Sequence, residues 1–580
     1  MLYNAALLFC VFAWAWLQPA GSKANTESET AGMMRQVQHH IESRLSVQNQ
    51  TQQFVCRGET ICGFKLIPLF YRELGFAPAW MNGRKLRPKA KVLIQAVQNA
   101  FHDGLEPQDY HAIAIAETLA MLTNASDFTI QKQAEYWADL DLLLTDAFLL
   151  LGTHLSGGRI DPETLHSDWL VGERSIDLLL LLHTASDVNR LDHAIEQLRP
   201  AHRGYLGLRN AMRRLRIQQA QGGWPAITGG ATLRPGNSDP RVPTLRRRLG
   251  LSGDIESGHA SDAPTHYDDA LVNAVKRFQT RHGLTPDGAV GPKTRKAMNV
   301  SIDKRIRQIE LNLERWRWLP NDLGHRRIVV NTADFSLRVV EGDADVLKMR
   351  VVVGRPARRT PVFSSQMSYM VFNPYWNVPH TIAAEDILPK LVSDVDYLAR
   401  QNIRVFTDWT ESAGEINPQT VNWTRYDETY FPFRLRQEPG PNNALGRIKF
   451  IFPNRFAVYL HDTPQRSLFN FTQRDFSSGC IRLENAQALA AYLLNGQPAG
   501  LPETLASTLN RGMRRVVRIP NPIPVHLIYM TAWVDHDNRL QFRNDIYHRD
   551  RDLNTALKQR PPDPPPPLAT MDESGAADEF

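Results

Sequence analysis

Hydrophobic and polar residues follow different patterns in successive parts of this chain of 580 residues. Between about residue 30 and residue 230, apolar side chains recur at helical intervals, and the run EYWADLDLLLTDAFLLLGTHL keeps that spacing for about five turns. The segment SIDLLLLLHTAS predicts a second buried helix in the same region. Residues 25–234 are therefore expected to form a helical scaffold domain.

A glycine-rich break, GGWPAITGGATLRPGNSD, separates this region from a compact module over residues 235–300. The run VPTLRRRLGL predicts one short helix, and Leu271, Val275 and Phe278 fall on one face of another. The segment TPDGAVGPKT then closes the module with two glycine turns.

From about residue 325, short β-rich segments replace the helical pattern. RRIVVNTADFSLRVVEGD predicts two strands around a turn, and VLKMRVVVGRPARRTPVF predicts two more. In FAVYLHDTP, Ala457, Tyr459 and His461 alternate with Val458 and Leu460, so the two sets are expected on opposite faces of one strand. The segment IPVHLIYMTAWVDHDNRLQF predicts a final strand pair.

This β-rich domain is expected to cover residues 301–555, with a more polar, helix-bearing insertion at about 379–437. The predicted fold class is thus multidomain α+β. Residues 556–580 are rich in proline and then acidic, so they are expected to be disordered.

The N-terminal residues predict export. Residues 5–17 form an almost unbroken apolar run that is short for a membrane-spanning helix. Ser22-Lys23-Ala24 resembles a signal-peptidase site. Residues 1–24 are therefore interpreted as a signal peptide or an uncleaved anchor, and the protein is expected in the periplasm, where it would be either soluble or anchored to the inner membrane.

Composition adds little to the prediction of function. A length of 580 residues exceeds what one hydrophobic core supports, which predicts several domains. The net charge of +6 is mild for this length, and it fits either an anionic polymer as partner or scattered surface cations. No HExxH or comparable spacing predicts a metal site, and no cofactor or nucleic acid is expected.

The four cysteines separate into three groups. Cys10 lies in the predicted signal. Cys56 and Cys62 are six residues apart in a loop-like segment, which favours a local disulfide in an oxidising compartment over two buried free thiols. Cys480 is left as an odd thiol that is either inert or functional.

Candidate chemistry concentrates in YLHDTPQRSLFNFTQRDFSSGCIRLEN, residues 459–485. Acyl transfer by a cysteine needs a thiolate, a base within reach, and N–H groups directed at the oxyanion. Cys480 is the candidate nucleophile and His461 the candidate general acid and base. Gly479 would let a carbonyl approach the N–H of Cys480 closely.

This stretch resembles the L,D-transpeptidase (YkuD) family, whose motif is His, some fifteen residues, then Ser/Thr-His-Gly-Cys, an apolar residue and Arg. The residues that match in order are His461, Ser477, Gly479, Cys480, Ile481 and Arg482. The motif's second histidine is Ser478 here, so His461 is left to take the thiol proton, and Ser478 at most donates a hydrogen bond or shapes the turn.

Two further resemblances extend the match. The segments RWRWLP, VVVGRP, TPVFSS, FNPYWNVP, PGPNNALGRIKFIFPN and VYLHDTP resemble the large Gram-negative, YcbB-like subgroup of that family. Residues 235–300 resemble a three-helix peptidoglycan-binding module through Phe278-Gln279, Gly283-Leu284, Asp287-Gly288, Gly291 and Thr294.

The resemblance implies a thioester mechanism on peptidoglycan. Cys480 would attack the L,D bond of a tetrapeptide donor stem and release D-Ala, and the side-chain amine of an acceptor diaminopimelate would then form a 3→3 cross-link. The insertion would act as a lid that excludes water. Carbapenems would acylate Cys480, and other wall synthases are candidate partners.

Further side chains are candidates for substrate contact, each with a structural alternative. Arg482 could hold a stem carboxylate or cap the turn, and Tyr459 could contact substrate or pack. Trp376 and Asn373 could line the site or belong to the core. Two other functions stay open at this point: an L,D-carboxypeptidase, in which water resolves the thioester, and a non-catalytic wall-binding scaffold.

Overall fold

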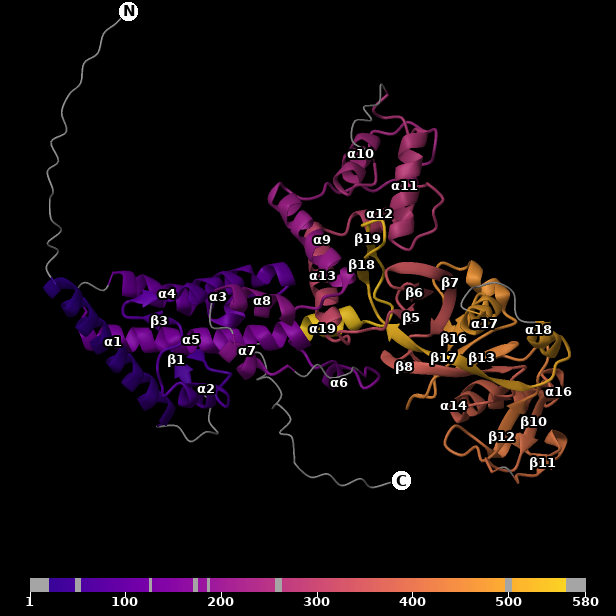
Figure 1. Cartoon of the computed structure of the whole chain (residues 1–580). Coiled ribbons are helices and arrows are strands. Elements are labelled where there is room, and N and C mark those ends of the chain that lie inside the picture. Colours follow the sequence, from indigo (N-terminus) through magenta and orange to yellow (C-terminus); the bar gives the residue numbers. More distant parts are fainter. Residues whose placement is uncertain are drawn as a thin grey trace, which may run out of the picture.

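The computed structural model describes residues 20–46, 54–124, 128–170, 176–184, 188–255, 263–410, 412–495 and 503–559. It consists of an elongated helical part, a small helical module and a β-rich body with a cap at its far end (Figure 1). The multidomain α+β class predicted from the sequence is confirmed. Most of the predicted signal, residues 1–19, and residues 560–580 of the predicted disordered tail lie outside the described residues.

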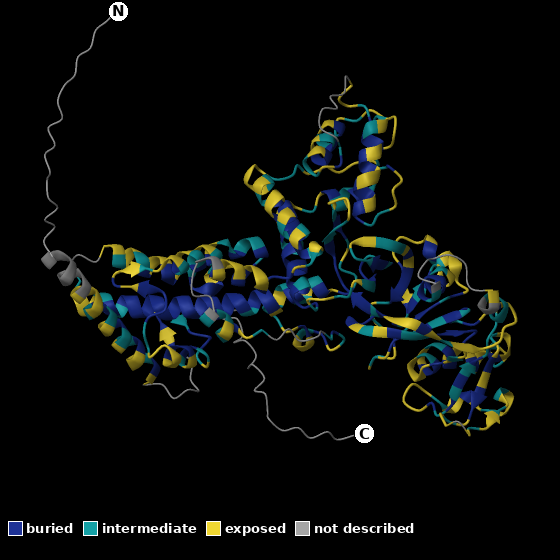
Figure 2. Ribbon diagram, viewed as in Figure 1, coloured by how far each residue is buried: buried dark blue, intermediate teal, exposed yellow. Residues whose placement is uncertain are grey.

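The helical part is organised around α5 (Ile130–Gly157). This helix is buried along nearly its whole length, as the dark blue ribbon in Figure 2 shows, because helices surround it. Its apolar length would suffice to cross a membrane, yet its most apolar stretch is buried inside the protein. The surrounding helices are α1 (Ala20–Ser46), α2 (Ile67–Glu73), α3 (Pro88–Gln98), α4 (Ala112–Thr123), α7 (Leu178–Thr184) and α8 (Val188–Leu198).

Three buried carboxylates on α5 hold the neighbouring loops. Asp141 accepts the backbone N–H groups of Ala79 and Trp80 at 2.7 and 2.9 Å. Asp146 accepts the N–H of Cys62 at 3.1 Å. Asp139 pairs with Arg44 at 2.7 Å. Each buried charge is thus compensated by donors from another segment, as a dry interior requires.

The predicted disulfide between Cys56 and Cys62 is wrong for this structure, in which both are free, buried thiols. Cys56 pairs with Glu59 across the hairpin of β1 (Val55–Cys56) and β2 (Glu59–Thr60). Cys62 follows Glu59 by three residues, so it lies about 10 Å further along the hairpin than the partner of Cys56. A disulfide needs Cα atoms less than about 7 Å apart.

The module contains α10 (Val242–Leu251), α11 (Asp269–Arg281) and α12 (Pro292–Met298), and the first two agree with the predicted helices. Leu271, Val275 and Phe278 are all buried in its core. Arg543 docks the module onto the β-rich body, because its guanidinium donates to Arg281 O at 2.9 Å on the module and to Asp334 at 2.7 Å on the body.

Helix α13 (Ile302–Arg317) joins the three parts. One of its faces packs on α9 (Arg203–Ala220) and on the hairpin of β18 (Ala532–Val534) and β19 (Leu540–Phe542). Glu314, also on α13, is almost fully buried and binds Arg317 on the same helix at 2.6 Å and the N–H of Ile160 at 3.0 Å. The helical part and the body are therefore packed against one another.

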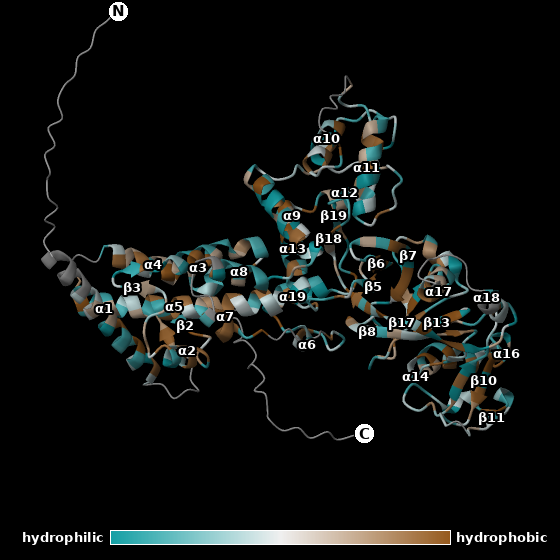
Figure 3. Cartoon of the chain, viewed as in Figure 1, coloured by the Kyte–Doolittle hydropathy of each residue, from teal (hydrophilic) through white to brown (hydrophobic). Residues whose placement is uncertain are grey.

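The body is a nine-stranded sheet in the order β15-β7-β16-β14-β13-β8-β17-β5-β6, and an additional β6–β7 pairing closes it into a barrel. Buried hydrophobic residues from the strands and the adjoining helices form its core. Hydrophobic residues are brown on the ribbon of Figure 3. The strands are β5 (Arg326–Asn331), β6 (Ser336–Glu341), β7 (Ala344–Gly354), β8 (Phe363–Phe372), β13 (Ile448–Ile451), β14 (Leu460–His461), β15 (Asp475–Ser477), β16 (Ile481–Leu483) and β17 (Arg515–Ile528). The helices α17 (Ala486–Asn495), α18 (Glu503–Asn510) and α19 (Arg549–Ala556) accompany it.

The strand predicted over FAVYLHDTP is shorter than expected. Only Leu460 and His461 form β14, and Ala457 lies in a turn with φ of +52°. Asn454 causes this turn, because its side chain accepts the N–H groups of Phe456 and Val458. A side chain that satisfies backbone donors in this way replaces the ladder of a strand.

The insertion forms a cap with its own core and its own four-stranded sheet, in addition to the predicted helices. This sheet is ordered β11-β10-β12-β9, and its strands are short enough to be missed by their pattern. The cap elements are β9 (Trp376–Asn377), α14 (His380–Ile382), a π-helical turn Ala383–Ile387, α15 (Leu388–Ser393), α16 (Tyr397–Arg400), β10 (Ile403–Phe406), β11 (Glu415–Ile416) and β12 (Arg434–Gln437).

Native protein treated with iodoacetamide should remain unmodified at Cys56 and Cys62. Burial and the carboxylate of Asp146 raise the pKa of Cys62 to about 12, and burial together with Asp139 raises that of Cys56 as well, so neither forms a thiolate near neutral pH. Peptide mass mapping should find both alkylated after unfolding in guanidinium without reductant. A disulfide-linked peptide under those conditions would contradict the structure.

Candidate active site

The pairing of β14 with β16 brings the two motif residues together. The strands run parallel, with His461 opposite Arg482 and Leu460 opposite Ile481. The N–H of Ile481 donates to Tyr459 O at 3.1 Å, which places Cys480 beside Tyr459. Leu460 and Ile481 face the core, so Tyr459, His461 and Arg482 lie on the opposite face of the sheet.

His461 is a buried, neutral imidazole. Its Nδ1 lies 2.6 Å from the carbonyl oxygen of Asp462, so Nδ1 carries the hydrogen, and the backbone of Leu445 is a second hydrogen-bond partner of the ring. A backbone carbonyl, rather than a carboxylate, therefore orients the ring. Burial, with a smaller contribution from the charge of Arg482, lowers the pKa of His461 to about 3.

Cys480 is half-buried next to Tyr459. Burial raises the pKa of its thiol above the ordinary value. Hydrogen bonds from the backbone and hydroxyl of Tyr459 and the charges of Lys449 and Arg482 oppose that shift. The site therefore holds a thiol whose neighbouring donors and cations favour its ionisation, on the same strand face as the neutral imidazole of His461.

The turn before Cys480 is held by Ser477. Its hydroxyl donates to Cys480 O at 2.5 Å and accepts the N–H of Gly479 at 3.2 Å. Gly479 has φ of +114°, a conformation that side chains rarely adopt. Because the N–H of Gly479 is already used, the N–H of Cys480 is the better candidate for binding an oxyanion.

Thr360 anchors this turn from behind. Its buried hydroxyl donates to Gly479 O at 2.7 Å and accepts the N–H of Gly354 at 2.9 Å. The hydroxyl of Tyr547 donates to Gly354 O at 2.6 Å, which ties a distant segment to the same place. Neither Thr360 nor Tyr547 was found from the sequence, because their role depends on contacts over more than a hundred residues.

Ser478, which replaces the motif histidine, connects the turn to the cap. Arg358 donates to its hydroxyl at 3.0 Å and to Asp386 of the cap at 2.5 Å. The same guanidinium also binds Glu385, and both carboxylates lie in the π-helical turn Ala383–Ile387. One arginine therefore joins the turn before Cys480 to a carboxylate pair of the cap.

The other predicted residues differ in their placement. Trp376 is half-buried on β9 and hydrogen-bonds the Tyr459 side chain, so it lies at the site. Arg482 is on the same face and donates to Gln465 Oε1 at 2.5 Å. The expectation that Asn373 lines the site is wrong, because its buried amide donates to Met513 O at 3.0 Å and accepts from Arg447 at 3.1 Å.

Lys449 also lies at the site, although the sequence did not predict it. It lies directly opposite His461 on β13, and its ammonium is 3.7 Å from the centre of the Tyr459 ring. Burial lowers the pKa of Lys449. The alternation in RIKFIF could have suggested a strand, but its pairing partner depends on the fold.

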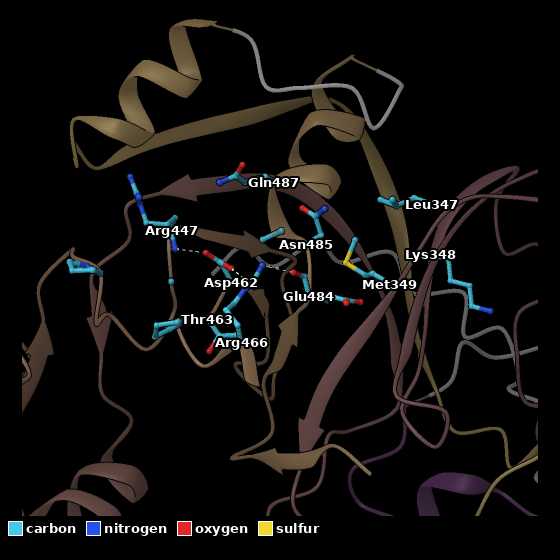
Figure 4. Close-up of a pocket in the computed structure, with 14 residues that line it drawn as sticks. Leu347, Lys348, Met349, Arg447, Asp462, Thr463, Arg466, Glu484, Asn485 and Gln487 are labelled. Atoms are coloured by element: carbon cyan, nitrogen blue, oxygen red, sulfur yellow. Dashed lines mark hydrogen bonds and ion pairs between the residues drawn. The ribbon is translucent and has the colours of Figure 1, made fainter. Parts of the chain in front are cut away.

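A cleft of about 640 Å³ lies at the far end of these strands, and its lining does not include Cys480 or His461 (Figure 4). Asp462 forms part of its wall, accepting the N–H of Arg447 at 2.9 Å and pairing with Arg466 at 3.2 Å. Gly446 lies so close that a Cβ there would be 2.6 Å from the carboxylate of Asp462. These contacts fix the residue whose carbonyl orients His461.

Alkylation of Cys480 by iodoacetamide should accelerate steadily from pH 6 to pH 9, without a plateau near neutrality. His461 has a pKa of about 3 and stays neutral over this range, while burial raises the thiol pKa, so the thiolate fraction grows with pH throughout. Mass spectrometry at each pH measures the rate. A plateau between pH 6 and pH 7 would indicate a thiolate–imidazolium pair and contradict this charge state.

Thr360→Val should lower the free energy of unfolding by about 2–4 kcal/mol, because a buried carbonyl and a buried N–H each lose their partner. It should also slow alkylation of Cys480, since the turn loses its anchor. Thr360→Ser keeps the hydroxyl and is the matched control, with an expected loss of about 1 kcal/mol or less. Equal losses in denaturant titrations of both variants would show that only the methyl group matters.

Comparison with known proteins agrees with this geometry. Residues 325–501 match the family described as "L,D-transpeptidase catalytic domain". Residues 238–298 match "Putative peptidoglycan binding domain", and residues 65–212 match "Scaffold domain".

A protein of Haemophilus influenzae described as "Putative L,D-transpeptidase" is 37% identical over 250 residues, which are 43% of this chain and 49% of that protein. The chain thus spans about half the length of this relative. A crystal structure of an L,D-transpeptidase from Xylanimonas cellulosilytica is 14% identical and covers 52% of this chain and 99% of its own, but its TM-score of 0.16 is too low to compare the folds. The β-rich body that holds Cys480 and His461 belongs to the L,D-transpeptidase catalytic domain family, and a peptidoglycan-binding domain precedes it in the chain.

Proposed function

We propose that this protein is an L,D-transpeptidase that forms 3→3 cross-links in peptidoglycan through a thioester on Cys480. The observation that carries the proposal is that Cys480 and a carbonyl-oriented, neutral His461 lie on the same face of two paired strands in the matched catalytic domain. A neutral imidazole whose Nδ1 carries the hydrogen is the form that can accept a thiol proton at Nε2.

In the first step, the sulfur of Cys480 attacks the carbonyl of the third residue of a tetrapeptide donor stem. His461 takes the thiol proton and delivers it to the nitrogen of the departing D-Ala, so a C–S bond forms as the C–N bond breaks. The N–H of Cys480 stabilises the oxyanion.

In the second step, the side-chain amine of an acceptor diaminopimelate attacks the thioester. His461 takes a proton from the amine and returns it to the sulfur, which restores the thiol and leaves an amide cross-link. The cap lies over the turn before Cys480 through Arg358, and a closed cap would keep water from competing with the amine.

An L,D-carboxypeptidase remains the second candidate, because it needs the same residues and differs only in accepting water. A wall-binding scaffold without activity is less well supported, since Ser478 leaves the thiol and the imidazole in place. As further parts of the proposal, the protein is exported to the periplasm, and it resembles the large Gram-negative YcbB-like subgroup. Peptidoglycan is its polymeric partner, carbapenems acylate Cys480, and other wall synthases are candidate partners.

Purified protein incubated with diaminopimelate-containing disaccharide-tetrapeptides should yield a dimer lighter than two monomers by one alanine, as measured by mass spectrometry. Cys480→Ala should abolish this product, and His461→Ala should slow acylation by about 10²–10⁴-fold. Circular dichroism of both variants controls for folding.

Tripeptide without dimer would instead identify a carboxypeptidase. If wild-type protein gave neither product and formed no carbapenem adduct at Cys480, the enzymatic proposal would be wrong and the scaffold would be favoured.

A further inference from the structure

The face of the barrel that carries Cys480 is lined by cations and lacks carboxylates in its central rows. The register aligns Arg482, His461, Lys449, Val371 and Val516 across five strands, from β16 to β17. Alternate residues share a face, so the neighbouring row on this side contains Cys480, Tyr459, Ile451, Tyr369 and Arg518. Neither row contains an aspartate or a glutamate.

Lys449 lies in the middle of the first row, between His461 and Val371, and its charge favours ionisation of the Cys480 thiol. Its side chain is half-buried and rests on Tyr459, whose hydroxyl hydrogen-bonds Cys480. Its ammonium is therefore about one tyrosine ring away from the thiol. Among the residues that the structure describes, Lys449 forms no ion pair with a carboxylate, although its charge is partly removed from water.

A second cation lies at the open side of the same surface. Arg514 precedes β17 and contacts the ring of Tyr375, with its guanidinium 5.7 Å from the ring centre, and Arg436 of the cap contacts the same ring at 4.6 Å. The charge of Arg514 contributes to lowering the pKa of Lys449, so the two cations are neighbours. Two close cations without a carboxylate between them favour an anionic ligand.

We infer that Lys449 binds the terminal carboxylate of the donor stem, the group that leaves with D-Ala. This inference rests on the proposed function. In that substrate only the scissile nitrogen and one carbon separate the reacting carbonyl from the carboxylate. When that carbonyl lies against Cys480, the carboxylate is therefore within one side-chain width of the thiol. The ammonium of Lys449, which contacts the Tyr459 ring, lies within the same range.

This assignment makes Lys449 a residue that determines specificity. A stem extended by one further residue presents an amide at the same place and gives no charge for the ammonium to bind. Leaving a half-buried ammonium without its anion costs more than losing an exposed ion pair. The protein should therefore prefer donors whose scissile bond is the last one of the stem.

The experiment compares two donors, disaccharide-tetrapeptide with a free terminal carboxylate and the same compound with a terminal carboxamide. Release of alanine or alaninamide gives kcat/KM for each. Wild-type protein should favour the free acid by about 10- to 100-fold, the range expected for one charge-assisted hydrogen bond. Lys449→Met should slow the acid more than the carboxamide and so remove this preference, although both donors also lose a charge that favours the Cys480 thiolate. Lys449→Arg should retain part of the preference.

Lys348→Met is the matched control, because Lys348 is an exposed lysine on β7 outside these rows, and it should keep the full preference. If Lys449→Met slowed both donors equally, the lysine would act only on the thiol or on the fold, and the inference would be wrong. Equal rates for both donors in wild-type protein would also overturn it, while leaving the proposed function intact. Release from neither donor would instead refute the proposed function.

Discussion

The parallel pairing of β14 with β16 is the constraint on which the site depends. It aligns His461 with Arg482 and sets Cys480 beside Tyr459, although the two strands are separated by a long loop. A shift of one residue would turn His461 into the core and expose Leu460, so burial of Leu460, Ile481 and Leu483 enforces the register. One strand register therefore determines both the packing of the barrel core and the positions of Cys480 and His461.

Charge at this site is arranged around an imidazole that stays neutral. Burial keeps His461 neutral, so the positive charges that lower the pKa of the Cys480 thiol come from Lys449 and Arg482. Proton acceptance and charge stabilisation are thus assigned to different side chains in the proposed mechanism. In the proposed mechanism, the imidazole accepts the thiol proton while the two cations stabilise the thiolate that forms.

Much of the fold follows from local patterns, whereas the surroundings of the site do not. The periodicity of α5 and α11 and the strands β5 to β8 were predictable because their apolar residues repeat at the spacing of each element. Cys480 and His461 could be named because they stand in one short motif. Thr360, Arg358 and Lys449 could not, since each meets the site through a contact distant in sequence. The wrong expectations for Asn373 and the Cys56–Cys62 pair have the same origin, because the spacing of residues in the sequence does not show which distant segments they contact in the fold.

The docking of the helical module through Arg543 sets a fixed geometry for work on a polymer. Its guanidinium contacts both sides of the junction, and Gly283 is packed so closely that a Cβ would lie 2.6 Å from the arginine side chain. A module held this tightly cannot act as a loose tether. If the module binds the wall as proposed, the distance from the bound strand to Cys480 is fixed. That distance then limits which neighbouring stems can be joined.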